Sequence, residues 1–381
     1  MNDLVIIGVN TRPQVNSAKK LDYNVKSSSY FTTIDFPDNI EEKHILTEES
    51  DESCGLFEEN YSPLKLLENG KEYIKKAERI ILTSGITPED FTGEFSKYRK
   101  KIIGNKKTKH VSDKYRFYKE NSNNFLMPMT FLTNDVYEIE EILKEYKDIQ
   151  FIIKPNHGSG GYNTILLNYD KYIENNDIKN IIENIINNLG EILVQEYIEG
   201  INISSSVLSS KTDAKTIMNT RLLTLNDIGF KNNYKYCGNI LPLDIRSIQE
   251  FTNIKTHDEV GMKNLNEDMN ILSEEIIKKL NLIGSNGVDL ILSNKENESN
   301  NVLNNDIYLI EVNPRFQGTY ESIEKVLSIN LLKEHINSCN GEIISKLNPK
   351  NYCIKEIIYS PNKIKQGNLE IKNLYDISKE N

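Results

Sequence analysis

Tryptophan is absent from the 381-residue sequence, cysteine occurs only four times, and there is no long uninterrupted apolar run. The cysteines are far apart and form no Cys-x-x-Cys pair, which argues against a zinc site and for the reduced thiols of a cytoplasmic protein. No stretch approaches the length of a membrane span, and the short apolar start after Asp3 fits neither a signal peptide nor an anchor. We therefore expect a globular, cytoplasmic protein without a membrane partner.

Positive charge is scarce as well. The chain carries 56 acidic and 46 basic residues, a formal net charge of -10, and no block rich in Lys or Arg offsets this balance. The balance argues against nucleic acid and an anionic membrane surface as partners, while a local basic pocket for phosphates remains compatible with it. The sequence also contains neither Gly-x-Gly-x-x-Gly nor a Walker loop, so it indicates neither a dinucleotide site nor a P-loop.

The length suggests two or three packed units, and the first unit opens with a β-α-β pattern. Residues 4–9 are apolar enough for a buried strand, Pro13 lies near the start of a helix, and a turn and strand follow within residues 24–35. A doubly wound sheet begins in this way. We place the end of this unit near residue 105 and expect the acidic residues 41–59 to form a surface loop or a helix.

A glycine-rich loop separates two apolar strands within residues 151–167, and its first four residues are His157-Gly-Ser-Gly. Glycines let backbone N–H groups approach and surround an anion, and Lys154 on the entering strand adds a positive charge. Lys114, early in a predicted helix, is a second cation, although a lysine in that position is usually solvated. The loop therefore predicts a phosphate-binding hairpin, and the alternative is a tight turn without a ligand.

Oxygen-bearing side chains recur on two short strands. Within residues 307–318, regular alternation places Leu309, Glu311 and Asn313 on one face of a strand. Asp289 lies in a second apolar strand upstream. If the two strands pair as an antiparallel hairpin around the Asn-rich insert between them, three oxygen donors converge. Such a set suits a hard cation held between protein carboxylates and substrate phosphates; the alternative is a solvated edge strand.

Five segments, taken in order, resemble the motifs of the ATP-grasp superfamily across residues 105–340. They are SDK at 112–114, KPNHGSGG at 154–161, VQEYIEG at 194–200, GVDLIL at 287–292 and EVNPRFQG at 311–318. The NPRFQG ending and the VNTRP opening look most like the archaeal-type group described as predicted ATP-dependent carboligases related to biotin carboxylase. Single motifs of this kind are weak, and their shared order makes the resemblance specific.

The resemblance implies an α/β fold, α+β in the lid, with ATP-grasp architecture behind a doubly wound, Rossmann-like pre-ATP-grasp domain. The implied units are the N-terminal domain at 1–105, a lid subdomain at 106–195, a C-terminal subdomain with the metal site at 196–340, and a small extension at 341–381. The extension itself is rich in strand-forming residues and carries a turn signal at 360–362.

The resemblance also implies how phosphates and metal would be held. Lys114 and Lys154 would contact the ATP phosphates, and Arg315 would lie where the transferring phosphoryl group meets a substrate carboxylate, so Lys154 and Arg315 are the expected catalytic residues. The mobile lid would consist of Gly158, Ser159, Gly160 and Gly161. The ligands of Mg²⁺, or of Mn²⁺ in its place, would be Asp289, Glu311 and Asn313.

The implied nucleoside site departs from the family pattern at one position. Gln195 would meet the adenine amino group, and the main chain of Glu196 and Ile198 would meet the ring edge; on the residues alone, an ordinary strand exit is the alternative. Many relatives bind the ribose with a Glu where this chain has Asn202, which leaves the ribose contact open. The segment around Arg221 offers no side chain that we can place as a catalytic base.

These expectations favour an ATP- and magnesium-dependent ligase that joins a small-molecule carboxylate to an amine through an acyl phosphate. One alternative is a carboxylase-like enzyme that activates bicarbonate through carboxyphosphate, although the chain has no MKM-like biotinyl-lysine segment. A second is an ATP-binding regulator without turnover, against which the complete set of metal ligands argues. The two substrates stay unidentified, and a homodimer is one possible assembly.

Overall fold

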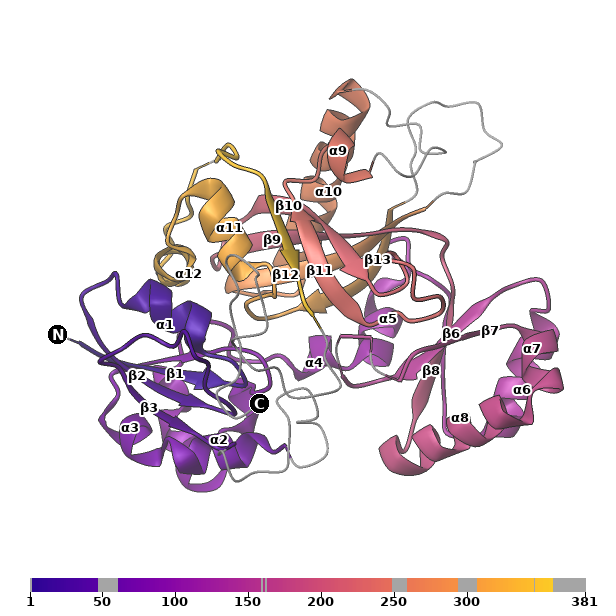
Figure 1. Cartoon of the computed structure of the whole chain (residues 1–381), viewed down its shortest axis with the longest axis horizontal. Coiled ribbons are helices and arrows are strands. Elements are labelled where there is room, and N and C mark those ends of the chain that lie inside the picture. The colour runs from indigo at the N-terminus through magenta and orange to yellow at the C-terminus, as the bar shows by residue number, and fades with distance from the viewer. Residues whose placement is uncertain are drawn as a thin grey trace.

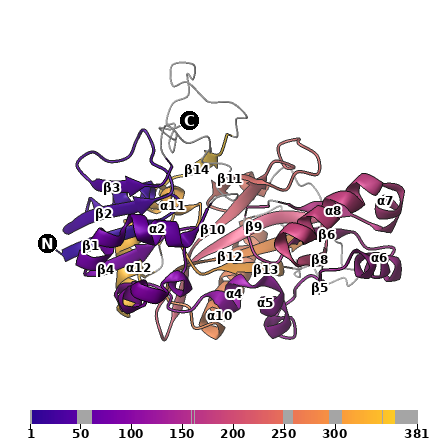
Figure 2. The same cartoon turned by 90° about the horizontal axis from the view of Figure 1, so that it is seen from below.

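The computed structural model describes residues 2–46, 61–158, 160–161, 163–248, 259–293, 307–345 and 347–358. Within these residues the chain forms three β-sheets with helices packed against them (Figure 1). The N-terminal domain and the lid lie on opposite sides of the six-stranded sheet, and the view turned by 90° shows the same order (Figure 2). This mixed α/β fold confirms the predicted fold class.

The N-terminal domain is a four-stranded parallel sheet with the order β3-β2-β1-β4. Its first strand is buried on both faces because Leu4, Val5, Ile6 and Ile7 are all at most 1% exposed, as in a sheet covered by helices on both sides. The elements are β1 (Asn2–Gly8), α1 (Arg12–Ala18), β2 (Tyr23–Ser29), β3 (Glu41–His44), α2 (Pro63–Asn69), α3 (Lys71–Lys76) and β4 (Arg79–Leu82).

The start of the acidic segment forms a strand, so the prediction of a loop or helix is wrong there. Glu41–His44 form β3, an edge strand that pairs in parallel with β2. Lys26 on β2 donates to Glu41 on β3 across 3.0 Å, so opposite charges on adjacent strands offset the low strand propensity of Glu. The remainder of this segment, residues 47–59, lies outside the described residues.

The second sheet belongs to the lid and has the order β5-β8-β6-β7, all antiparallel. Its helix α8 buries Ile178, Ile182 and Ile185, which repeat at helical spacing, and ends at Gly190 with a φ of 84°. After the 3₁₀ segments η1 (Pro88–Asp90) and η2 (Gly93–Lys101), the elements are α4 (Lys109–Ser112), α5 (Lys114–Asn121), β5 (Thr130–Thr133), α6 (Val136–Glu145), β6 (Phe151–Pro155), β7 (Ile165–Leu167), α7 (Tyr169–Glu174), α8 (Asn176–Leu189) and β8 (Ile192–Glu196).

The third sheet has six strands in the order β13-β12-β9-β10-β11-β14. Helix α10 packs against one face over a core that includes Met269, Ile276 and Val288, while α11 and α12 pack between the other face and the N-terminal domain. The elements are β9 (Gly200–Ser209), β10 (Ala214–Thr224), β11 (Tyr236–Leu241), α9 (Ile245–Ile248), α10 (Glu259–Lys279), β12 (Gly284–Ser293), β13 (Ile307–Asn313), α11 (Tyr320–Leu327), α12 (Leu331–Cys339) and β14 (Cys353–Glu356).

A buried ion pair joins the N-terminal domain to α11. Both terminal nitrogens of Arg12, in the VNTRP segment, donate to the two carboxylate oxygens of Glu321 at 2.7 and 2.6 Å. Arg12 is only 2% exposed, and Asp35 lies 3.4 Å from the same guanidinium. This two-pronged geometry is the most specific that Arg and a carboxylate form, so it sets how the N-terminal domain sits against the six-stranded sheet.

The C-terminal extension contributes one strand in its described part. β14 pairs antiparallel with β11, with Lys355 opposite Asn239. The predicted turn at 360–362 lies outside the described residues.

Candidate active site

A cavity of about 850 Å³ lies where the N-terminal domain, the lid and the six-stranded sheet meet. The N-terminal domain supplies Asn10 and Ser84, the lid supplies Lys154, and the six-stranded sheet supplies Asp289 and Glu311. Ligand pockets commonly form at such junctions between domains, where a small number of polar groups converge on a concave surface. All the predicted site residues that the structure describes line this cavity; Ser159 lies outside the described residues.

The strand that carries Glu311 pairs antiparallel with the strand of Asp289, and these two residues are direct cross-strand partners. The pairing register shifts between them and the next pair, Leu290 with Leu309, so that Ile310 has no partner in the ladder. This β-bulge corrects the prediction of regular alternation. Leu309 faces the apolar core rather than sharing a face with Glu311, and the extra residue turns Glu311 toward the cavity.

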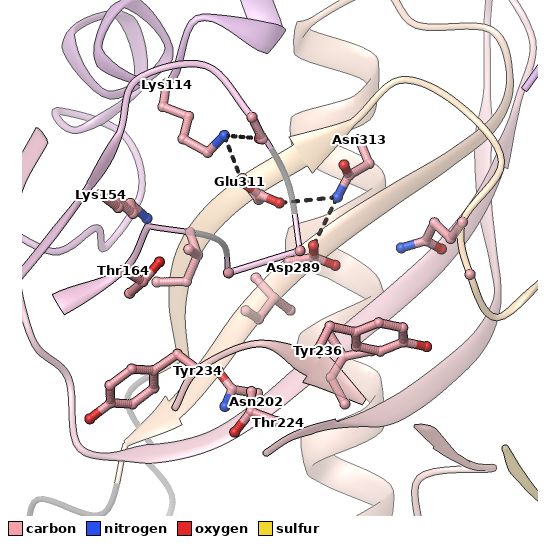
Figure 3. Close-up of a pocket in the computed structure, with 18 of the residues that line it drawn as sticks. Lys114, Lys154, Thr164, Asn202, Thr224, Tyr234, Tyr236, Asp289, Glu311 and Asn313 are labelled. Carbon is pink, nitrogen blue, oxygen red and sulfur yellow. Dashed lines mark hydrogen bonds and ion pairs between the residues drawn. The ribbon is translucent and has the colours of Figure 1, made fainter. Parts of the chain in front are cut away.

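The acidic side of the cavity is a hydrogen-bonded cluster of two carboxylates and an amide. The amide nitrogen of Asn313 donates to Asp289 Oδ2 at 2.8 Å and lies 3.5 Å from Glu311 Oε1 (Figure 3). Ser204 Oγ donates to Asp289 Oδ1 at 2.7 Å. Burial, followed by the adjacent charge of Glu311, raises the pKa of Asp289 to about 7.

Cations face this cluster from the lid side. Lys114 Nζ lies 3.4 Å from Glu311 Oε2 and donates to the carbonyl of Gly158 at 2.6 Å (Figure 3). Burial lowers the pKa of Lys154 to about 8, against the opposing charge of Glu311. Burial acts to raise the pKa of Glu311, but the charges of Lys114 and Lys154 outweigh it and hold that pKa below its ordinary value. The two lysines therefore favour the ionised form of Glu311, and the charge of Glu311 in turn favours the protonated form of Lys154.

The residues present fit a hard divalent cation. Asp289, Glu311 and Asn313 offer only oxygen ligands, and the amide nitrogen of Asn313 already faces the carboxylates, which leaves its oxygen for a ligand. No group of three or more His, Cys, Asp or Glu side chains arranged for a metal occurs in the described parts of the chain. Two carboxylates and one amide match Mg²⁺, which keeps other positions for waters and phosphate oxygens.

The glycine loop packs against the start of β11. Gly160 and Gly161 both have a φ of 76°, in the left-handed region that side chains disfavour. The backbone N–H of Tyr236 donates to the carbonyl of Gly160 at 3.1 Å. A Cβ on Gly161 would lie 2.1 Å from the carbonyl oxygen of Tyr234, so only glycine permits this approach.

The predicted adenine contacts all line the cavity and come from β8 and the residues just after it. Gln195 is 7% exposed and its amide nitrogen donates to Thr130 Oγ1 at 2.9 Å, so its oxygen is the atom left for a ligand. The N–H of Glu196 donates to Met129, whereas that of Ile198 meets no acceptor among the described residues. Asn202 also lines the cavity (Figure 3).

Sequence reasoning assigned no chemical role to several residues in and around the cavity. Tyr234 and Tyr236 sit beneath the glycine loop, and Lys355 of β14 donates to the carbonyl of Gly318 at 3.0 Å. Asn156, two residues after Lys154 in the quoted motif, is not among the lining residues; its side chain accepts from the N–H of Tyr115 at 2.9 Å and so fixes the helix of Lys114. Arg221 does not line the cavity, and it donates to the carbonyl of Ser247 instead.

The fold and the cavity define the chain as an ATP-grasp protein. The ATP-grasp domain family matches residues 111–258 and 258–319, more than half of the chain, which therefore belongs to this family. The uncharacterized protein MJ0776 of Methanocaldococcus jannaschii is 30% identical over 383 residues, which span 99% of this chain and 84% of that protein. Both findings confirm the resemblance inferred from the motifs.

Solved structures share the fold at low sequence identity. An N5-carboxyaminoimidazole ribonucleotide synthetase in complex with ADP has a TM-score of 0.66 at 12% identity, with 93% of this chain and 80% of that chain covered. The biotin carboxylase domain of Hydrogenobacter thermophilus 2-oxoglutarate carboxylase has a TM-score of 0.65 at 16% identity, with 93% and 73% covered. None of the helices that the structure describes is long and apolar enough to cross a membrane.

Proposed function

We propose that this protein is an ATP- and magnesium-dependent ligase that joins a small-molecule carboxylate to an amine through an acyl phosphate in the cytoplasm. The observation that carries the proposal is the meeting of opposite charges in one cavity. Glu311 lies 3.4 Å from Lys114 and acts on the pKa of Lys154, and both lysines stand on the lid side of the acidic cluster. A nucleoside triphosphate with a bound divalent cation complements the lysines through its phosphates and the acidic cluster through its cation.

The nucleotide would lie along the cavity with its base near β8. The Ile198 N–H and the Glu196 carbonyl would meet the adenine edge, Gln195 Oε1 the amino group, and Asn202 the ribose region. At the other end, Lys114 and Lys154 would bind the phosphates beneath the flap of Gly158, Ser159, Gly160 and Gly161. Backbone N–H groups of such glycines can surround an anion without a Cβ in the way.

The metal would be held by Asp289, Glu311 and Asn313, with Mn²⁺ able to replace Mg²⁺. When bound, it neutralises negative charge on the phosphates, which is its usual contribution to phosphoryl transfer. The carboxylates would orient the ion, and Lys114, which lies 3.4 Å from Glu311, would exchange this contact for one with a phosphate of the bound nucleotide.

Arg315 would align the reacting groups. It follows the acidic cluster by two residues in the chain and lines the cavity, and its charge acts on both Asp289 and Glu311. A substrate carboxylate oxygen would attack the γ-phosphorus and ADP would leave; an amine would then attack the acyl carbon and phosphate would leave. Positioning and charge suffice for both steps, so no nucleophilic side chain is required.

Bicarbonate activation is the second candidate. The solved structures with a similar fold favour it, because one of them is a biotin carboxylase domain in complex with MgADP and bicarbonate. In that reaction bicarbonate takes the place of the substrate carboxylate at Arg315, and carboxyphosphate is formed.

The test is a screen for ADP release by the full chain with Mg-ATP over a panel of carboxylates and amines. ADP release that requires one acid and one amine, with acyl hydroxamate formed when hydroxylamine replaces the amine, is the expected result. ADP release with bicarbonate and no amine would replace the proposal by the second candidate. Tight ATP binding without ADP release over the whole panel would indicate a regulator without turnover. Light scattering of the same sample tests for a homodimer.

A further inference from the structure

A chain of hydrogen bonds runs beside the acidic cluster and connects the lining residues Gln317 and Thr319 to Asp289 through two serines that do not line the cavity. Ser206 Oγ donates to Gln317 Oε1 at 2.6 Å, and Gln317 Nε2 donates to Ser204 Oγ at 3.0 Å. Ser204 Oγ then donates to Asp289 Oδ1 at 2.7 Å. Thr319 Oγ1, at the start of α11, lies 3.5 Å from Ser206 Oγ at the far end. The chain therefore links the turn after β13 to one carboxylate of the cluster.

The register of β9 against β12 makes this chain possible. Ser204 is the cross-strand partner of Asp289, and Ser206 is the partner of Gly287. A Cβ on Gly287 would lie 1.9 Å from Gln317 Nε2, so the amide of Gln317 lies over the space left by the missing side chain. Gly287 has no positive φ, which means that space, and not backbone conformation, is what requires glycine there.

All donors in the chain point toward Asp289, whose carboxylate is the final acceptor. Its second oxygen accepts from Asn313, so both oxygens have a fixed donor. Ser204 and Ser206 are 1% and 4% exposed, where water does not compete for these hydrogen bonds. Buried networks that are fully satisfied hold their members in one geometry, and bonds that run in one direction strengthen each other.

We propose that Gln317, acting through Ser204, is a positioning residue that fixes the orientation of the Asp289 carboxylate for the divalent cation. The inference rests on the proposed function, because it assumes the metal site. It assigns the Gln of the NPRFQG segment, which also lines the cavity, to the support of the metal ligands. Outer partners of this kind commonly change metal affinity by about 10–100-fold when removed.

The experiment measures Mn²⁺ binding directly. Full-length protein with a nonhydrolysable imido analogue of ATP is titrated with Mn²⁺, and free Mn²⁺ is followed by electron paramagnetic resonance. Ser204→Ala, Gln317→Leu and Gly287→Ala are each expected to raise the Mn²⁺ Kd at least about tenfold. Gly287→Ala removes no hydrogen-bonding group and only displaces Gln317, so it keeps the test decisive if a polar substitution unfolds the chain.

The matched control is Ser205→Ala. Ser205 lies between the two chain serines, is fully buried and donates to Asn219 Oδ1 at 2.7 Å, away from the acidic cluster. Its loss removes an equivalent buried hydroxyl and is expected to leave the Mn²⁺ Kd within twofold of wild type. Ser204→Thr keeps the hydroxyl and is expected to bind Mn²⁺ within about threefold of wild type.

The outcomes separate the inference from the proposed function. If the wild-type protein takes up no Mn²⁺ with the analogue, the proposed function fails at the metal site. If wild type binds Mn²⁺ and Gln317→Leu and Gly287→Ala bind it equally well, the positioning role is wrong while the metal site stands. Equal weakening by Ser205→Ala would likewise overturn the role, because it would show a general loss of packing in β9.

Discussion

The lid sheet and the six-stranded sheet border the same cavity, yet they contribute charge of opposite sign. The lid side brings Lys154 on β6 and Lys114 on α5, whereas the six-stranded sheet brings Asp289 and Glu311 on β12 and β13. Buried charge is costly unless it is paired, and here each side supplies the partner of the other. The site therefore exists only where the two sheets meet, because neither sheet supplies both signs of charge.

Removal of an acid from the six-stranded sheet is expected to break this arrangement most severely. Glu311→Ala removes the carboxylate that faces Lys114 and Lys154 and also removes a metal ligand. We expect turnover to fall about a thousandfold, roughly 4 kcal/mol, with the fold intact by circular dichroism. The exposed Glu267→Ala on α10 is the control and should retain full turnover. Turnover within tenfold of wild type in Glu311→Ala would rule out the metal assignment.

Removal of a cation from the lid is expected to cost less, because a second lysine remains. Lys154→Met should lower kcat/KM for ATP about a hundredfold, roughly 3 kcal/mol, through lost charge at the phosphates. The exposed Lys144→Met on α6 removes the same charge from the same subdomain and should have no effect. Equal kinetics for the two variants would show that the cation at position 154 has no role in nucleotide binding.

The contact between the two sheets can also be broken sterically. Gly161→Ala places a Cβ against the Tyr234 carbonyl, and we expect the KM for ATP to rise about tenfold, a shift of roughly 1.4 kcal/mol. Gly190→Ala is the control for backbone strain alone, because Gly190 has a φ of 84° but nothing lies within 4 Å of its ideal Cβ. A similar KM in both variants would argue that the flap need not approach β11.

An effect of similar size is expected from pH, through the carboxylates of the six-stranded sheet. The pKa of Asp289 is raised to about 7, and a protonated carboxyl does not bind a metal ion. The proton therefore competes below that pKa, and the Mn²⁺ Kd should rise about tenfold from pH 8 to pH 6, following a single proton. Asp289→Asn should bind weakly with a flat profile. A flat profile in wild type would show that Asp289 stays ionised throughout this range.

Local patterns in the sequence were sufficient for much of this arrangement. The Glu311 strand, the Asp289 strand and the antiparallel pairing between them followed from apolar runs and from the Asn-rich insert that separates them. Helix α8 and its end at Gly190 followed from isoleucines at helical spacing and a glycine cap. These features depend on interactions between residues near each other in the chain, which is where propensity and periodicity carry information.

The features that the sequence could not reveal depend on contacts between residues far apart in the chain, or on one extra residue in a strand. The bulge at Ile310 breaks a period of two, and an alternation count contains no signal for the break. Gln317 and Ser204 are 113 positions apart, and both belong to uncharged residue types that are common anywhere in a chain. Tyr234 and Tyr236 contact two glycines of the loop between β6 and β7, more than 70 positions away in the chain. Such contacts are set by tertiary packing.

The ion pair of Arg12 with Glu321 has a consequence for the order in which the protein matures on the ribosome. The two residues are 309 positions apart, so at about 5–20 residues per second Glu321 is added roughly 15–60 s after Arg12. Until then Asp35 is the carboxylate available to Arg12, and the N-terminal unit has no α11 to pack against. The cavity, which needs both units, can therefore close only after Glu321 has been added.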